Sequence, residues 1–385
     1  MLLLCRRSKM SPAAIEVPTK ESQTTKVPTG QLSGAFLDLA PIDYGLEVEK
    51  EGKDGIKPAK YPHYLPTWPD VKWAPTEPFH HCDPGFDADP DYPEILAKGV
   101  KSFDITPTIG TEIKGMQLSR LSPAGKDQLA RFVAERKVVI FRDQDFADLP
   151  IGDAVNFVRY FGRPHLHPLS GAPKGHPEVH LVHKAAGDRT AEEFFKTKTS
   201  SVLWHSDVSY ERQPPGTTLL MMLDGPESGG DTLYVNTAEA YNRLSEGFKE
   251  RLHGLKAIHS GFDQASAHLR KGGVVRREPI MSEHPVVRTH PVTGEKSIYV
   301  NPQFTRSIVG YKQEESDALL KFLYDHIAYG SDFQMRARWE EKTVVVWDNR
   351  VTSHSALLDW KAGPRRHLAR IAAQAEAPVE TPYAG

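Results

Sequence analysis

The sequence has only two cysteines, Cys5 and Cys82, among its 385 residues. Two cysteines cannot form a disulfide framework, and this scarcity is typical of proteins from reducing compartments. The chain begins with apolar residues followed by Arg6 and Arg7, and Met10 is an alternative start. A secretory signal has the opposite order and a longer apolar region. We therefore expect a cytoplasmic protein.

The sequence also lacks an excess of charge of one sign and lacks long apolar runs. The 48 Lys and Arg residues nearly balance the 50 Asp and Glu residues, which leaves a net charge of −2. No global electric field therefore favours nucleic acid or an anionic membrane surface. No run reaches the roughly 18 apolar residues that a membrane-spanning helix needs. We expect neither nucleic acid nor a membrane as a partner.

The composition divides the chain into two parts. Residues 1–95 are rich in proline and charge, and dense prolines prevent regular helices and central strands. We expect the first ~30 residues to be disordered. The rest of this part should be an arm lying on the main domain, residues 96–385, and anchored by Trp68, Trp73 and Phe79.

The second part shows short strands and a few helices. Ser122 followed by Pro123 predicts the start of a helix. Apolar residues at helical spacing predict further helices over 154–161 and 313–327. Short apolar runs separated by Gly and Pro turns predict strands at 138–141, 217–223, 232–235, 297–300, 343–347 and 368–372. This pattern favours a mainly β fold with flanking helices, a double-stranded β-helix or jelly roll.

The strongest candidate for a metal site is the pattern His205-Ser206-Asp207, taken together with the distant His354. On an extended segment, residues two apart point to the same face. Two imidazoles and a carboxylate without a thiolate suit Fe(II), and such a triad leaves coordination positions open. The alternative is a histidine that is hydrogen-bonded near a strand end, because His-x-Asp is common by chance.

The residues around this pattern resemble the TauD/TfdA family of Fe(II)/2-oxoglutarate dioxygenases, and most closely its fungal and yeast sulfonate dioxygenases. The resemblance extends from about Phe103 to the C-terminus. The matching segments are Trp204-His205-Ser206-Asp207, Gly229-Gly230-Asp231-Thr232-Leu233, Val346-Trp347-Asp348-Asn349-Arg350, His354 and Arg365-Arg366 with Arg370.

The resemblance implies His205, Asp207 and His354 as iron ligands. It implies Thr232 and Arg366 as the groups that bind the distal carboxylate of 2-oxoglutarate. Arginine presents a planar fork that matches a carboxylate. Arg365 is the alternative to Arg366, and Arg370 favours Arg366 because residues i and i+4 share a face of a strand.

The resemblance also implies a binding site for a small anionic substrate. His167 and Arg370 match the residues that hold a sulfonate, and the site would be lined by Trp347, Val208 and Phe304. His165 is more simply a surface histidine, and a metal site at His165 and His167 lacks a carboxylate at useful spacing.

Departures from the taurine-type pattern concern the same site. Ser170 and Ser201 replace a Tyr and an Asn, and a polar insert lies between Gly171 and Ser201. These differences favour a larger or differently shaped anionic substrate, with taurine as only one possibility. The insert is expected to be a long loop that acts as a lid.

The implied reaction consumes 2-oxoglutarate and O2, gives succinate and CO2, and hydroxylates the substrate. If the hydroxylated carbon carries a sulfonate, sulfite and an aldehyde are released. Carboxylates, aryloxyalkanoates, sulfate esters and amino-acid derivatives are alternative substrates. A binding protein with a degenerate site would have lost a ligand or an Arg, and none is missing. The family also implies a possible homo-oligomer, a dimer or tetramer.

Overall fold

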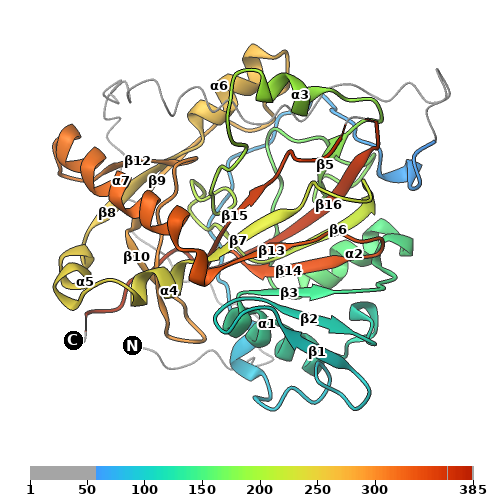
Figure 1. Ribbon diagram of the computed structural model, residues 1–385, viewed down its shortest axis with the longest axis horizontal. Coiled ribbons are helices and arrows are strands. Elements are labelled where there is room, and N and C mark those ends of the chain that lie inside the picture. The colour runs from blue at the N-terminus through green and yellow to red at the C-terminus, as the bar shows by residue number, and fades with distance from the viewer. Residues whose placement is uncertain (1–57, 362, 384–385) are drawn as a thin grey trace.

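The computed structural model describes residues 58–361 and 363–383. Two β-sheets that face each other form its centre (Figure 1). The larger sheet has eight strands in the order β1-β2-β3-β14-β6-β16-β4, with β5 also paired to β16. These strands span Lys101–Asp104 (β1), Thr111–Lys114 (β2), Val138–Phe141 (β3), Arg163–Pro164 (β4), His180–Lys184 (β5), Pro215–Asp224 (β6), Val344–Asp348 (β14) and Arg366–Gln374 (β16).

Three smaller sheets complete the β structure. The sheet β13-β7-β15 faces the large one, and the sheets β12-β8-β9 and β10-β11 lie to one side (Figure 1). Their strands span Thr232–Asn236 (β7), Lys256–Ser260 (β8), Met281–Pro285 (β9), Val287–Thr289 (β10), Lys296–Ile298 (β11), Thr305–Ile308 (β12), Gln334–Ala337 (β13) and Thr352–Ala356 (β15).

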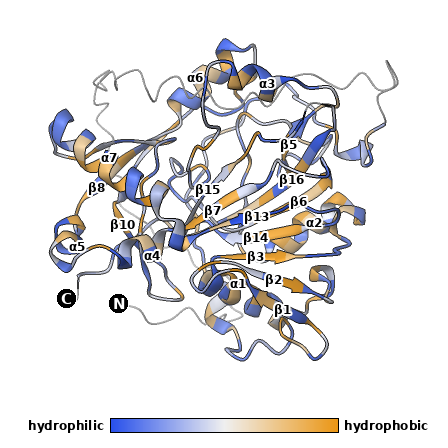
Figure 2. Cartoon of the chain, in the orientation of Figure 1, coloured by the Kyte–Doolittle hydropathy of each residue, from blue (hydrophilic) through white to orange (hydrophobic). Residues whose placement is uncertain are grey.

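The strands at the centre are buried on both faces, which explains their continuous apolar sequences. In β14, Val344 and Val346 pack in one core with the helices, while Val345 and Trp347 pack in a second core between the two sheets. Alternate residues of a strand point to opposite faces. The strand β3, the middle of β6 and the first part of β14 are accordingly hydrophobic (Figure 2).

Helices cover the outer face of the large sheet and surround the smaller ones. The helices α1 and α2 supply Leu129, Val133 and Val158 to the outer core. The helices span Pro123–Arg136 (α1), Ile151–Arg159 (α2), Thr190–Phe195 (α3), Thr237–Asn242 (α4), Glu246–Leu252 (α5), Phe262–Arg270 (α6) and Gln313–Tyr329 (α7). The predicted start of α1 is confirmed, because Pro123 is its first residue and the Ser122 hydroxyl accepts from Gly125 N–H at 3.1 Å.

Two predicted elements differ from the structure. The strand expected at 297–300 is β11, Lys296–Ile298, because the chain leaves the ladder after Ile298. The stretch between Gly171 and Ser201, expected to be a long loop, contains the strand β5 and the short helix α3, and no residue of α3 is buried. Just before α3, Asp188 Oδ1 accepts a hydrogen bond from Thr190 N–H at 2.8 Å.

The described part of the N-terminal segment lies on the main domain. Arg276 stacks its guanidinium on Trp73, 5.4 Å from the ring centre, and its carbonyl accepts from Trp73 N–H. Arg163 stacks on Phe79 at 4.1 Å. Trp68 lies so close to Gly171 that a Cβ there would be 2.9 Å from the ring. The first ~30 residues are outside the described part of the chain, so the division at residue 95 stays a prediction.

Candidate metal and anion site

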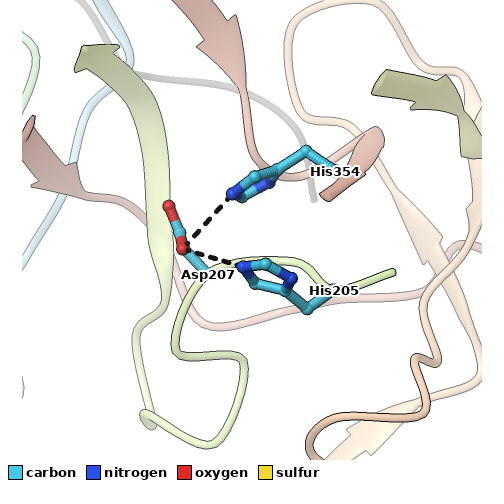
Figure 3. Close-up of side chains that lie close together, drawn as sticks. All are labelled: His205, Asp207 and His354. Atoms are coloured by element: carbon cyan, nitrogen blue, oxygen red, sulfur yellow. Dashed lines mark ion pairs between the residues drawn. The ribbon is translucent and has the colours of Figure 1, made fainter. Parts of the chain in front are cut away.

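Three side chains that are far apart in the sequence converge at one end of the facing sheets. Asp207 Oδ1 lies 3.7 Å from His205 Nε2 and 3.6 Å from His354 Nε2 (Figure 3). Within the described residues, these three form a group whose potential ligand atoms all lie within 4.8 Å of one another. The predicted convergence of the His-x-Asp pattern with the distant histidine is therefore present.

Backbone pairing produces this convergence. His205 and His354 form an antiparallel bridge, with N–H to O distances of 3.0 and 2.8 Å. The chain then turns at Asp207, and Val208 has φ of 41°. Positive φ is unusual for a β-branched residue, and such strain clusters at functional sites. The expected extended geometry was thus wrong beyond Ser206, because a turn, and not a strand, aims Asp207 at the two histidines.

The protonation of the three side chains suits metal binding. His205 Nδ1 lies 2.9 Å from the Leu203 carbonyl, which only accepts, so Nδ1 carries the proton and the Nε2 lone pair faces Asp207. Burial lowers the pKa of His205, and burial together with His205 lowers that of His354 to about 3. Metal ligands must be neutral imidazoles and ionised carboxylates.

Asp207 is ionised although it is buried. Burial alone would raise the pKa of its carboxyl, but Arg370 and the two histidines lower it far below the usual range. Its Oδ2 atom is buried without a hydrogen-bond partner among the described residues. Buried orphan atoms need an explanation, and a cation bound by His205, Asp207 and His354 fits this donor set.

Asn349 fixes the backbone of Asp207, a role that the sequence reasoning missed. Its Oδ1 accepts from Asp207 N–H at 2.8 Å, and its Nδ2 donates to the Asp207 carbonyl at 3.1 Å. The segment Trp347-Asp348-Asn349-Arg350 therefore holds the segment His205-Ser206-Asp207 in place. The signal was available in Trp347-Asp348-Asn349-Arg350, where Asn349 is a polar residue directly after a buried strand.

Arg366 and Thr232 lie beside a common loop. Arg366 donates from Nε and Nη2 to the Gly230 carbonyl, at 3.1 and 2.7 Å, two residues before Thr232. Its guanidinium also stacks on Trp360. Thr232 is buried, and its hydroxyl accepts from Trp339 Nε1 at 3.1 Å. Arg365 instead pairs with Asp224 at 2.8 Å.

Arg370 joins the metal group to a cluster of histidines. It forms an ion pair with Asp207, and its Nη2 lies 3.3 Å from His180 Nδ1. The His180 ring lies edge-on to His167, with ring centres 4.6 Å apart. The predicted anion-binding pair, His167 and Arg370, therefore lies on either side of His180, a residue to which the sequence reasoning gave no role.

His165 is buried, which corrects the expectation of a surface histidine. Its Nε2 lies 2.9 Å from Glu211 Oε1, so the structure does supply a carboxylate. Glu211 is also paired with Arg277, which neutralises it. An arginine cannot ligate a metal, so this arrangement is a buried ion pair and not a second metal site.

The predicted lining residues fall in two places. Val208 and Phe304 pack together with Tyr210 in one small apolar cluster. Trp347 is completely buried between the sheets and contacts His354 edge-on, with ring centres 5.1 Å apart. Tyr234, a third residue that the sequence reasoning missed, stacks on His354, with ring centres 5.7 Å apart. Trp347 and Tyr234 thus support His354, a candidate metal ligand, from the core side.

This fold and site define a mainly β protein with a His-Asp-His group that could hold a metal ion. The family model for taurine catabolism dioxygenase TauD, TfdA family, matches residues 101–372. An α-ketoglutarate-dependent sulfonate dioxygenase of Saccharomyces cerevisiae is 45% identical over 84% of this chain and 79% of its own length. An α-ketoglutarate-dependent dioxygenase of Penicillium expansum, cnsP, is 45% identical over 83% of this chain and 87% of its own length.

Solved structures agree with the sequence comparisons. The crystal structure of a taurine dioxygenase from Burkholderia xenovorans has a TM-score of 0.60 and 33% identity, covering 73% of this chain and 91% of that one. The chain belongs to the TauD/TfdA family. It is a non-haem iron dioxygenase that depends on 2-oxoglutarate, another name for α-ketoglutarate, and the predicted jelly-roll class is confirmed.

Across residues 58–361 and 363–383, no helix has the length and apolar character needed to cross a bilayer.

Proposed function

We propose that this enzyme binds Fe(II) through His205, Asp207 and His354 and hydroxylates an alkyl sulfonate such as taurine at the carbon next to sulfur. The observation that carries the proposal is the buried convergence of these three side chains beside Arg370. Iron bound there, together with 2-oxoglutarate and O2, would supply the oxidising chemistry. The protein's own groups bind and orient the two organic reactants.

Arg366 and Thr232 are the proposed contacts for the distal carboxylate of 2-oxoglutarate. Both are buried, and Arg366 already donates to a carbonyl oxygen. A guanidinium fork and a hydroxyl suit a carboxylate end group. Arg366, and not Arg365, is the proposed residue because Arg365 is engaged by Asp224.

His167 and Arg370 are the proposed contacts for the substrate anion, with Val208 and Phe304 on the apolar side and Trp347 behind His354. His167 Nδ1 accepts from the N–H groups of Leu169 and Ser170, both at 3.2 Å, so its proton is on Nε2. His167 is therefore a neutral donor near the positive Arg370. One charge and one neutral donor suit an anionic head group.

The sulfonate is the preferred substrate class because the yeast relative is named a sulfonate dioxygenase. Hydroxylation of the carbon that bears the sulfonate gives a 1-hydroxysulfonate, whose C–S bond then breaks to give an aldehyde and sulfite. One O2 and one 2-oxoglutarate are consumed, with succinate and CO2 as the other products. We also propose a cytosolic location, from the scarcity of cysteine, and a dimer or tetramer.

An anaerobic titration tests the metal and cosubstrate sites. Adding Fe(II) and then 2-oxoglutarate should produce a visible charge-transfer band in the wild type, and His205→Ala should lack both the band and turnover. Sulfite release across a panel of sulfonates, sulfate esters and carboxylates then identifies the substrate class. Undiminished substrate-coupled 2-oxoglutarate consumption by His205→Ala would contradict the metal assignment, and absence of sulfite from every sulfonate would contradict the substrate.

A further inference from the structure

His180 lies on the strand β5, at a point where pairing brings it beside Arg370. Antiparallel register places His180 opposite Arg370 and Lys184 opposite Arg366 on the neighbouring strand β16. Residues directly opposite in such a pair lie on the same face and interact. His180 and Lys184 therefore lie on the same face of the sheet as Arg370 and Arg366, the two proposed anion-binding arginines.

The contact between His180 and Arg370 has a defined direction. Arg370 Nη2 lies 3.3 Å from His180 Nδ1. A guanidinium has only donors, so His180 Nδ1 must accept and its proton must be on Nε2. Burial lowers the pKa of His180 well below its ordinary value, with a further contribution from Arg370, which is consistent with a neutral ring.

Two of the three guanidinium nitrogens of Arg370 have partners. Nη1 contacts Asp207 Oδ1 and Nη2 contacts His180, while Nε has no partner among the described residues. Only the His180 contact is independent of the proposed metal ligands. Restricting the rotamers of a long arginine side chain costs conformational entropy. Because His180 already holds the Arg370 side chain, less entropy is lost when Arg370 binds an anion.

We propose that His180 is a positioning residue, which accepts a hydrogen bond from Arg370 and so aims its guanidinium at the substrate anion beside His167. This inference rests on the proposed function and adds a residue to its substrate site. The edge contact between the His180 and His167 rings, 4.6 Å between centres, sets the distance between the two sides of the anion site.

Substitutions at His180 test this role in the iron-loaded enzyme. His180→Leu keeps much of the buried volume and removes the acceptor. It should raise KM for the sulfonate about tenfold or more with a much smaller change in kcat, because a hydrogen bond to a charged group is lost while the chemistry is untouched. The affinity for 2-oxoglutarate, read from the charge-transfer band, should be unchanged because His180 lies opposite Arg370, whereas Arg366 lies opposite Lys184. His180→Asn places an amide oxygen near the former Nδ1 position and should recover most of the loss.

His183 provides the matched control. It is a buried histidine on the same strand, but it faces His367 on the opposite side, with ring centres 4.7 Å apart. His183→Leu should leave KM for the sulfonate unchanged. If His180→Leu fails to fold, His180→Gln supplies the comparison, because its amide lies one bond further out and should also raise KM.

The outcomes separate this inference from the function on which it rests. If the wild type showed no charge-transfer band or no sulfonate turnover, the proposed function would be wrong, and this inference would be wrong with it. A wild type with both, and a His180→Leu variant with unchanged KM, would overturn the inference alone. Equal KM increases in His180→Leu and His183→Leu would also overturn it, since they would show a general effect of disturbing β5.

Discussion

At the scale of single residues, the position of Asp207 depends on a neighbour that cannot ligate a metal. Asn349 exchanges two hydrogen bonds with the Asp207 backbone where the chain turns. Asn349→Ala should weaken metal binding about 10- to 100-fold, the range typical for groups that orient a ligand. Titration with Mn(II) or Fe(II) under anaerobic conditions measures this.

The control for Asn349 is another buried asparagine. Asn236 caps α4 by accepting from the N–H groups of Ala238 and Glu239. Asn236→Ala should lower the free energy of unfolding by about 1 kcal/mol and leave metal affinity unchanged. If both variants lost metal affinity equally, global destabilisation and not the position of Asp207 would be the cause.

Two adjacent arginines give a second prediction at this scale. Arg366 lies over Gly230 and Trp360, whereas Arg365 pairs with Asp224. Arg366→Lys should raise KM for 2-oxoglutarate about tenfold or more, because an ammonium cannot reproduce the bidentate, stacked geometry. Steady-state kinetics with varied 2-oxoglutarate measures it. Arg365→Lys should be near neutral, and the reverse order of the two effects would show that Arg365 faces the cosubstrate.

At the scale of the element, two serines occupy the same position at different helices. The Ser122 hydroxyl caps α1, whereas Ser245 precedes α5 without a side-chain capping bond. Ser122→Ala should lower the free energy of unfolding by about 1 kcal/mol. Ser245→Ala should change it little. Urea unfolding of both variants is the measurement, and equal losses would contradict the role given to the Ser122 hydroxyl.

The elements show what the sequence could predict and what it could not. Pro after Ser122 and the apolar run of β14 carry local signals, because capping and burial act over a few residues. The turn that aims Asp207 depends on Asn349, and the contact of His180 depends on the register of β5 against β16. Both are long-range consequences of folding: the sequence marks Asn349 as a polar residue after a buried strand, but it does not identify the partner of Asn349 or of His180.

At the scale of the whole molecule, a buried ion network joins four distant segments. Arg350, the second residue after β14, contacts Asp83 of the N-terminal segment at 2.6 Å, Asp348 at 2.6 Å and Glu376 at 3.1 Å. Glu376 also binds Arg288 of β10 at 2.6 Å. Breaking a buried charge pair leaves an uncompensated charge and is costly. The network therefore ties the arm and the C-terminal segment to the strand that leads into the metal motif.

The charge on Glu376 makes this network sensitive to acid. Burial alone would raise the pKa of Glu376, but Arg350 and Arg288 lower it to about 2 in the folded protein. In the unfolded chain a Glu titrates near pH ~4.3. A carboxylate with a lowered folded pKa stabilises the protein fully above the unfolded value. That contribution is lost as the pH falls from about 4.3 towards about 2.

Glu376→Gln should therefore lower the free energy of unfolding by about 1–3 kcal/mol at pH 7, the range for hydrogen bonds to charged groups. The difference from the wild type should shrink as the pH falls below about 4.3, because protonation then removes the same charge from the wild type. Urea unfolding between pH 3 and 7 gives this difference directly. Glu193→Gln removes an exposed carboxylate of α3 that pairs with Lys196. It should leave the free energy of unfolding unchanged across this pH range, because exposed ion pairs contribute little to stability. A wild-type-to-variant difference that stayed constant across this pH range would show that Glu376 stabilises the fold through packing and not through its charge.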